Sequence, residues 1–163
     1  TALLTLLNEQ YEKNANIFGV TPLNTSGDKY SVYDNVDYKE LIINLFKEFS
    51  LPLDFEKQFI TGLSTDENVI KQIKELPKLD LVYIDGGHDY ETVVSDIELI
   101  KTRLNNNGMI VMDDASCSKN FEGLSIFTGH PEVCQAITDT LENDTNFEEI
   151  LCVGHNRVFK KIN

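Results

Sequence analysis

Two short acidic motifs each follow a predicted buried strand. The first is Asp-Gly-Gly-His at residues 85–88, and the second is the pair Asp113 and Asp114. Carboxylates that converge repel one another unless a cation lies among them or one of them binds a proton. Hard divalent ions such as Mg²⁺ prefer oxygen ligands. These residue types therefore indicate a site for a divalent cation at the ends of two strands.

A histidine lies three positions after the first of these acids. Gly86 and Gly87 allow the chain to turn sharply, which would hold the His88 imidazole close to a bound cation. An unperturbed imidazole has a pKa of about 6.5, so His88 could accept a proton near neutral pH. The structural alternative is that each acid only caps a helix or forms a turn. Two such motifs with a histidine between them favour a functional site.

The elements that position these motifs alternate between strand and helix patterns. Leu79–Ile84 and Met109–Met112 are nearly continuous apolar runs, typical of strands buried on both faces of a parallel sheet. The Asn run and Gly108 are expected to end the helix before the second of these strands. The other predicted strands cover residues 16–20, 55–61, 147–153 and 157–162, and helices are predicted over 1–14, from Asp37, from Asp66, over 92–104 and over 132–141.

This alternation predicts an α/β fold with a doubly wound, mostly parallel Rossmann-like sheet and helices on both faces. The last two strands form an antiparallel hairpin at one edge. We expect residues 1–163 to be a single domain. Ligands of such sheets bind at the carboxyl ends of the strands, where both acidic motifs lie.

Composition excludes several classes of function. The 163 residues include 14 Lys and Arg against 27 Asp and Glu, a net charge of −13, which argues against a nucleic-acid partner. No apolar run is long enough to span a membrane. The three cysteines contain no Cys-x-x-Cys, so neither a zinc ribbon nor a dithiol motif is indicated. We expect three reduced thiols in a cytoplasmic protein.

Several other polar residues have a structural interpretation. His130 precedes a proline near a helix start and is expected in a loop, and His155 is expected to be solvated in the hairpin turn. Asp96 is expected on an exposed helix face. The tyrosines at positions 30, 33 and 38 could cover the site or be ordinary loop aromatics.

The two strand ends together carry a family resemblance. Residues 79–90 (Leu-Asp-Leu-Val-Tyr-Ile-Asp-Gly-Gly-His-Asp-Tyr), then a helix, then residues 108–114 (Gly-Met-Ile-Val-Met-Asp-Asp) resemble the second half of a class I S-adenosylmethionine-dependent methyltransferase. The most similar subgroup is the macrocin-type, or methyltransferase 24-like, sugar O-methyltransferases. The resemblance extends over most of the chain, and the two strand-end motifs together are fairly specific.

The resemblance implies a reaction and a set of roles. Asp85, Asp113 and Asp114 correspond to the Mg²⁺ ligands of the metal-dependent members, and His88 corresponds to the general base of the macrocin-type enzymes. The metal orients a substrate hydroxyl and lowers its pKa. The deprotonated hydroxyl of a small molecule, such as a sugar, then attacks the sulfonium methyl group and S-adenosylhomocysteine leaves.

The residues implied to bind the cofactor depart from the family pattern at two positions. The resemblance places S-adenosylmethionine against Thr21, against Gly62, Leu63 and Ser64, and against Asp85 and Gly86. Thr21 stands where the family has the acid that binds the ribose, and Leu63 stands where an acid often lies near the adenine. The family's first strand and its glycine-rich loop have no counterpart, so we expect an N-terminally truncated domain whose sheet lacks its first strand.

Two rivals follow from these departures. A non-catalytic methyltransferase-fold scaffold within a larger protein is favoured by Thr21, Leu63 and the lost glycine-rich loop. A receiver-type signalling domain also gathers acids at strand ends, but there the acidic pair precedes the single acid, whereas Asp85 comes before Asp113 here. The expected partners are a small hydroxylated substrate and either a second copy or neighbouring domains, with no nucleic acid and no membrane.

Overall fold

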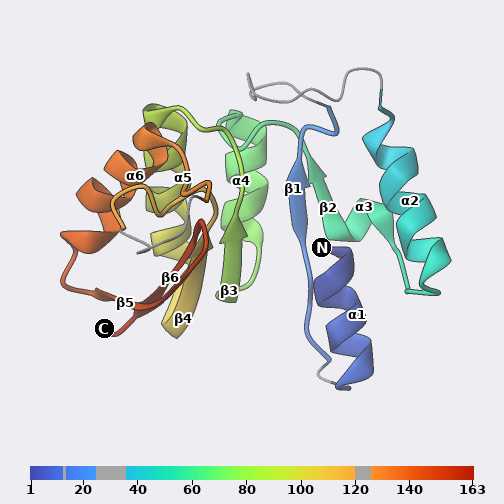
Figure 1. The fold of residues 1–163 in the computed structure, drawn as a ribbon. Coiled ribbons are helices and arrows are strands. Elements are labelled where there is room, and N and C mark those ends of the chain that lie inside the picture. The colour runs from blue at the N-terminus through green and yellow to red at the C-terminus, as the bar shows by residue number, and fades with distance from the viewer. Residues whose placement is uncertain (13, 25–35, 120–125) are drawn as a thin grey trace. The chain divides into compact units, whose positions relative to one another are not determined.

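The structure of the protein is a computed structural model that describes residues 1–12, 14–24, 36–119 and 126–163. The chain divides into two compact units, Thr1–Ile73 and Lys74–Asn163, and each is described by itself. Helices and strands alternate in both units, which confirms the predicted α/β class (Figure 1). Within the described ranges, no helix is both long and apolar enough to cross a bilayer.

The N-terminal unit contains a pair of parallel strands, β1 (Gly19–Thr21) and β2 (Phe59–Thr61). Their register places Gly19 beside Phe59 and Thr21 beside Thr61. The helices of this part of the chain are α1 (Ala2–Gln10), α2 (Tyr38–Glu48), α3 (Phe55–Gln58) and α4 (Glu67–Glu75). The predicted cap of α2 is confirmed, because the Asp37 side chain accepts a hydrogen bond from the Glu40 N–H at 2.9 Å.

The strand predicted over residues 55–61 is wrong in its first half. Phe55–Gln58 form the single helical turn α3, and only Phe59–Thr61 are extended. Phe55 and Phe59 lie four residues apart, so one helical turn stacks their rings at 4.7 Å. Phe59 also meets Phe46 of α2 edge-to-face, with 6.5 Å between ring centroids. This aromatic contact outweighs the strand preference of Phe55.

The C-terminal unit contains a four-stranded sheet in the order β3-β4-β6-β5. Strands β3 and β4 are parallel, β4 and β6 are antiparallel, and β5 and β6 form the predicted antiparallel hairpin. Helices α5 and α6 pack against each other beside this sheet (Figure 1). The elements are β3 (Leu79–Ile84), α5 (Tyr90–Arg103), β4 (Leu104–Met112), α6 (Pro131–Ile137), the π-helical turn η1 (Thr138–Glu142), β5 (Phe147–Val153) and β6 (Asn156–Lys161).

The Asn run does not end α5 as expected, because it belongs to β4. Helix α5 ends at Arg103, and Asn105 donates a hydrogen bond to Asp80 on β3 at 2.8 Å. The pairing of β4 with β3 shifts at this point, and Asn107 there has a left-handed backbone with a φ of 64°. Asn adopts that conformation more readily than most residues, so the run forms a bulge within the strand.

The core of the C-terminal unit lies between its sheet and its helices. Val93, Ile97 and Ile100 of α5 are buried at helical spacing. Strand β3 has the predicted bounds but is not buried on both faces, because Leu81 and Tyr83 are 45% and 51% exposed. The strands form two sheets, so the single doubly wound sheet and the single domain stay predictions.

Candidate functional site

The acids that follow β3 and β4 lie at the same end of the C-terminal sheet. The Asp113 N–H donates to the Ile84 carbonyl at 3.0 Å, which extends the parallel ladder to the two acidic positions. The Asp85 and Asp113 carboxyls consequently lie close enough to affect each other's ionisation. Burial and the charge of Asp113 raise the pKa of Asp85 from 3.8 to about 6, with a smaller contribution from Asp114 and an opposing one from His88. The sequence prediction that these carboxylates converge is met for this pair.

Asp114 occupies a tightly defined backbone position. Its φ is 50°, a left-handed conformation that Asp adopts more readily than most residues. Gly129 packs against it, and a Cβ atom at Gly129 would lie 2.0 Å from the Asp114 carbonyl oxygen. The His130 N–H donates to that same oxygen at 3.0 Å. Asp114 is therefore fixed between its own strand and the segment that leads into α6.

All three histidines of the chain face this acidic pair. His88 Nε2 lies 3.0 Å from Asp114 Oδ2, and His130 Nε2 lies 3.5 Å from the same oxygen. His155 Nε2 lies 3.1 Å from Asp113 Oδ1. His130 lies in the loop before α6 and His155 lies partly exposed in the hairpin turn, as expected. Their contacts with the acidic pair were not predicted from the sequence.

The imidazoles also pack against one another and against an aromatic ring. The rings of His88 and His130 lie 4.3 Å apart at 39°. Phe127 lies 5.4 Å from the His130 ring and 5.8 Å from the His155 ring, although it is 54% exposed. The hairpin turn and the segment before α6 thus meet over the acidic pair.

A small cavity of about 10 Å³ opens beside Asp85, His88 and Asp113. This volume is close to what one water molecule requires. Helix α5 supplies part of the surroundings, because a Cβ atom at Gly86 would lie 3.4 Å from Asp96 Oδ2. Asp96 is 9% exposed, so its predicted place on an exposed helix face is wrong.

Within the described ranges, two groups of side chains have the composition and spacing of metal ligands. One is His88, Asp114 and His130, and the other is Asp113, Asp114 and His155, with all donor atoms of a group within 4.8 Å of one another. Asp85 belongs to neither group, although its ionisation is affected by the charge of Asp113. The metal set Asp85, Asp113 and Asp114 stays a prediction.

Tyr83 is a further neighbour that the sequence analysis missed. It lies two residues before Asp85 on β3, so both side chains leave the same face of the strand. Burial and the nearby charges of Asp113 and Asp85 raise the pKa of the Tyr83 phenol, as does its hydrogen bond with Asp113. The phenol therefore stays protonated and donates to the acidic pair.

The predicted cofactor positions of the N-terminal unit lie together after β1 and β2. The Gly62 N–H donates to the Thr21 carbonyl at 3.0 Å, and the Thr21 hydroxyl accepts from the Leu23 N–H at 3.1 Å. The Leu63 N–H donates to Asp66 at 3.0 Å, and Ser64 follows in the same turn. Tyr38 begins α2, whereas positions 30 and 33 lie outside the described residues.

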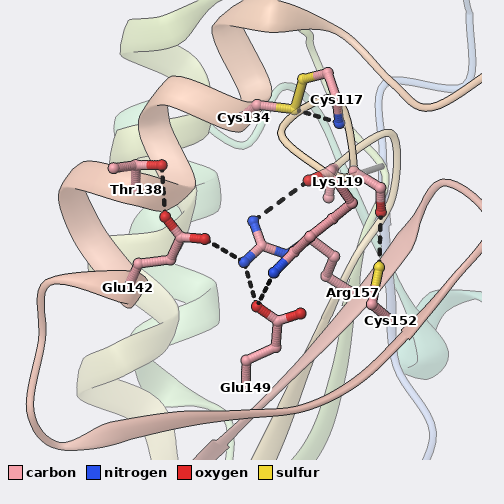
Figure 2. A network of polar contacts seen from close by, with 10 residues as sticks. Cys117, Lys119, Cys134, Thr138, Glu142, Glu149, Cys152 and Arg157 are labelled. Atoms are coloured by element: carbon pink, nitrogen blue, oxygen red, sulfur yellow. Dashed lines mark hydrogen bonds and ion pairs between the residues drawn. A yellow bond between two sulfur atoms is a disulfide. The ribbon is translucent and has the colours of Figure 1, made fainter. Parts of the chain in front are cut away.

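A buried arginine stabilises the strand next to the acidic pair. Arg157 begins the pairing of β6 with β4 opposite Met112, and its side chain is fully buried. It forms ion pairs with Glu142 and Glu149 and donates to the Ala115 carbonyl at 3.5 Å (Figure 2). The network therefore connects the residue after Asp114 to η1 and to β5.

The expectation of three reduced thiols is wrong. Cys117 and Cys134 form a disulfide with their Cα atoms 6.2 Å apart, and Cys152 is free (Figure 2). The bond joins the segment after the acidic pair to α6, whose N-cap residue is His130. The cytoplasmic location inferred from reduced thiols stays a prediction.

Removing this disulfide is expected to lower the free energy of unfolding by roughly 3 kcal/mol, as for a loop of about 15 residues. The bond spans 17 residues. Without it, the unfolded chain gains conformational freedom in this segment, which favours unfolding. Urea unfolding of Cys117→Ser measures the change, with Cys152→Ser as the matched control. Equal losses in the two variants would contradict the prediction.

Removing the charge of Asp85 is expected to stabilise the metal-free protein near neutral pH. Because the pKa of Asp85 is raised to about 6, the folded protein binds its proton more tightly than the unfolded chain does. Its contribution to stability is present below about pH 4 and is lost as the pH rises through about 6. With allowance for solvent screening, Asp85→Asn should gain roughly 1 kcal/mol at pH 7.5 in EDTA, measured by thermal unfolding. A loss of stability at that pH would contradict this expectation.

The comparison with protein families bears directly on these strand ends. Residues 42–115 match the family described as "Methyltransferase domain", and the matched segment contains Asp85, His88, Asp113 and Asp114. This segment of the chain is thus similar to methyltransferase domains. The resemblance predicted from residues 79–90 and 108–114 is therefore confirmed.

One curated protein and several solved structures are also similar to this chain. An uncharacterized protein of Acanthamoeba polyphaga mimivirus is 29% identical over 106 residues, which are 64% of this chain and 43% of the viral protein. CalS11, a TDP-rhamnose 3'-O-methyltransferase of calicheamicin biosynthesis, is 17% identical, with a TM-score of 0.62 over 98% of this chain and 65% of CalS11. The chain thus spans less than two thirds of either protein.

Two other solved structures share the fold. The O-methyltransferase NovP is 13% identical, with a TM-score of 0.67 over 99% of this chain and 66% of NovP. MycE, a methyltransferase of the mycinamycin pathway solved in complex with Mg and SAH, is 16% identical, with a TM-score of 0.50 over 96% of this chain and 48% of MycE. At these identities the comparison supports the fold.

Proposed function

We propose that the protein transfers a methyl group from S-adenosylmethionine to a hydroxyl of a small molecule, such as a sugar, with the help of Mg²⁺. The observation that carries the proposal is the convergence of Asp85, Asp113, Asp114 and His88 inside the matched methyltransferase segment. CalS11 acts on TDP-rhamnose and MycE was solved with Mg and SAH, which supports a sugar acceptor and a metal.

The side chains at the sheet end suit a hard cation. Asp85, Asp113 and Asp114 would hold Mg²⁺, and all three offer carboxylate oxygens. The raised pKa of Asp85 indicates that negative charge is crowded there, which a cation would relieve. When bound, Mg²⁺ orients the acceptor hydroxyl and lowers its pKa.

His88 is the proposed general base. The proton of the acceptor hydroxyl would be taken up by the His88 imidazole. Asp114 Oδ2 lies 3.0 Å from Nε2 and would stabilise the imidazolium that forms. The deprotonated oxygen attacks the sulfonium methyl carbon, the carbon–sulfur bond breaks, and S-adenosylhomocysteine leaves.

For the cofactor we propose the residues implied by the family resemblance. The nucleoside part of the cofactor would be bound by residues of the N-terminal unit, namely Thr21, Gly62, Leu63 and Ser64. Asp85 and Gly86, which follow β3, are also proposed to bind the cofactor. In this proposal the Leu63 side chain packs against the adenine and the Ser64 hydroxyl donates a hydrogen bond to the cofactor. The oligomeric state and neighbouring domains stay predictions.

Isothermal titration of the protein with S-adenosylhomocysteine, with and without Mg²⁺, tests the proposal. We expect S-adenosylhomocysteine to bind saturably. We also expect the protein to bind Mg²⁺ and the Asp85→Asn variant to lose this Mg²⁺ binding. Thr21 and Leu63 stand where acids are expected, which favours the rival interpretation of a non-catalytic scaffold. No binding heat for S-adenosylhomocysteine under either condition, from a chain that also includes the family's first strand and glycine-rich loop, would overturn our proposal in favour of that rival.

A further inference from the structure

Three side chains from separate segments direct metal-binding atoms toward one another. His88 follows β3, Asp114 follows β4, and His130 precedes α6. We propose that these three residues form a binding site for a divalent transition metal of the zinc class, and that this set differs from the magnesium set in all but Asp114. Zinc-class ions are bound well by imidazole, whereas Mg²⁺ prefers oxygen ligands.

The spacing of the donor atoms suits a single ion. Two ligand atoms bound tetrahedrally to one zinc at about 2.0–2.1 Å lie about 3.3–3.4 Å from each other. The Nε2 atoms of His88 and His130 lie 3.0 and 3.5 Å from Asp114 Oδ2, and the three atoms lie within 4.8 Å of one another. An ion could therefore take the place of the two imidazole–carboxylate contacts with little movement of the side chains.

The ligands are held in place by their surroundings. The side chains of His88 and His130 are 14% and 20% exposed, and their rings pack at 4.3 Å. The His130 backbone N–H is bonded to the Asp114 carbonyl at 3.0 Å, so two of the ligands are linked through the main chain as well. Such support of the ligands favours metal binding because less order must be imposed when the ion binds.

His155 provides the comparison within the same cluster. Its group with Asp113 and Asp114 has one imidazole and two carboxylates, and its side chain is 42% exposed on the hairpin turn. That composition is closer to the preference of Mg²⁺ or Mn²⁺. We therefore assign the zinc-class ion to the two less exposed histidines.

Occupation of this site has a consequence for the reaction. The metal would bind the imidazole of His88, which is the group that accepts the proton in the proposed function. Zinc is therefore expected to inhibit the methyl transfer that magnesium supports. This consequence rests on the proposed function, but binding of the metal does not.

Competition for Zn²⁺ between the protein and a chromophoric chelator, in the absence of S-adenosylhomocysteine, tests the site. We expect His130→Asn to weaken Zn²⁺ binding at least tenfold and the matched control His155→Asn to change it by less than about threefold. Wild-type affinity in His130→Asn, or equal losses in both variants, would overturn the proposal.

A measurement on the unaltered protein covers the case in which a variant does not fold. On addition of Zn²⁺, the imidazole NMR signals of His88 and His130 should shift together, with the His155 signal unchanged until more metal is added. A shift of His155 first would overturn the assignment. Binding of S-adenosylhomocysteine is measured separately, so a failure of the proposed function and a failure of the zinc site give different results.

Discussion

Replacing Asp114 by asparagine is expected to weaken the binding of both Mg²⁺ and Zn²⁺ by about 100-fold or more. Asp114 belongs to the predicted magnesium set and to both histidine-containing groups, so its carboxylate is the one ligand that they share. An amide keeps one oxygen ligand atom but carries no charge. The total negative charge of the cluster is therefore lower, and the cluster attracts a cation less strongly. A loss of this size is about 2.7 kcal/mol of binding free energy.

The substitution is chosen so that the fold persists. Asp114 has a φ of 50°, and asparagine tolerates this left-handed conformation at least as well as aspartate. Isothermal titration with each metal measures the effect. Asp80→Asn is the matched control, because Asp80 is an exposed acid of β3 that contacts Asn105 instead of the cluster. Magnesium affinity within about threefold of wild type in Asp114→Asn would refute the role of this carboxylate.

The position of the acids could be predicted because local sequence is enough to define it. The apolar run Leu79–Ile84 corresponds residue for residue to β3, so the strand end before Asp85 was fixed without knowledge of the tertiary structure. Parallel strands end at the same edge of a sheet, which brings Asp113 to Asp85. The mixed α/β class followed from the same alternation of strands and helices.

The two additional histidines could not be placed from local patterns. His130 reaches Asp114 through an antiparallel bridge between Ala115 and Gly129, which is a contact between distant parts of the chain. His155 reaches Asp113 because β6 returns antiparallel to β4 with Arg157 opposite Met112. The predicted hairpin contained this second signal, since a turn that precedes a strand paired antiparallel with β4 must lie near the end of β4.

The remaining differences have similar physical causes. Nothing in the spacing of the cysteines indicated that Cys117 and Cys134 would be brought together, because their pairing depends on where α6 packs. The helical turn at Phe55 depends on a ring contact with Phe59, and α-helical and extended patterns are hard to separate in so short a segment. Asp96 was assigned to the wrong face of α5 because its burial depends on the turn at Gly86.

Replacing Arg157 by methionine is expected to lower the free energy of unfolding by about 3–5 kcal/mol. The guanidinium is fully buried between Glu142 and Glu149 (Figure 2), and removing it leaves both carboxylates without their main partner. Burial alone raises the pKa of Glu142 and of Glu149, but their hydrogen bonds with Arg157 and other neighbours lower it overall. Because both pKa values are lower in the folded protein, the two carboxylates stabilise the fold at pH values above the usual pKa of glutamate. That stabilisation is lost as the pH falls through the pKa values of the folded protein.

Two further variants separate the loss of ion pairs from the loss of packing. Lys160→Met is the matched control, since it removes a cation from the same strand opposite Glu148 and should cost less than about 1 kcal/mol. Adding Glu142→Gln and Glu149→Gln to Arg157→Met should restore part of the stability, because neither position then carries a charge that has lost its arginine partner. Urea unfolding between pH 4 and pH 7 measures all of these changes. If Arg157→Met lowers the free energy of unfolding by no more than Lys160→Met does, the Arg157 network does not stabilise the end of β4. The position of Asp114 would then depend on the Gly129–His130 segment instead.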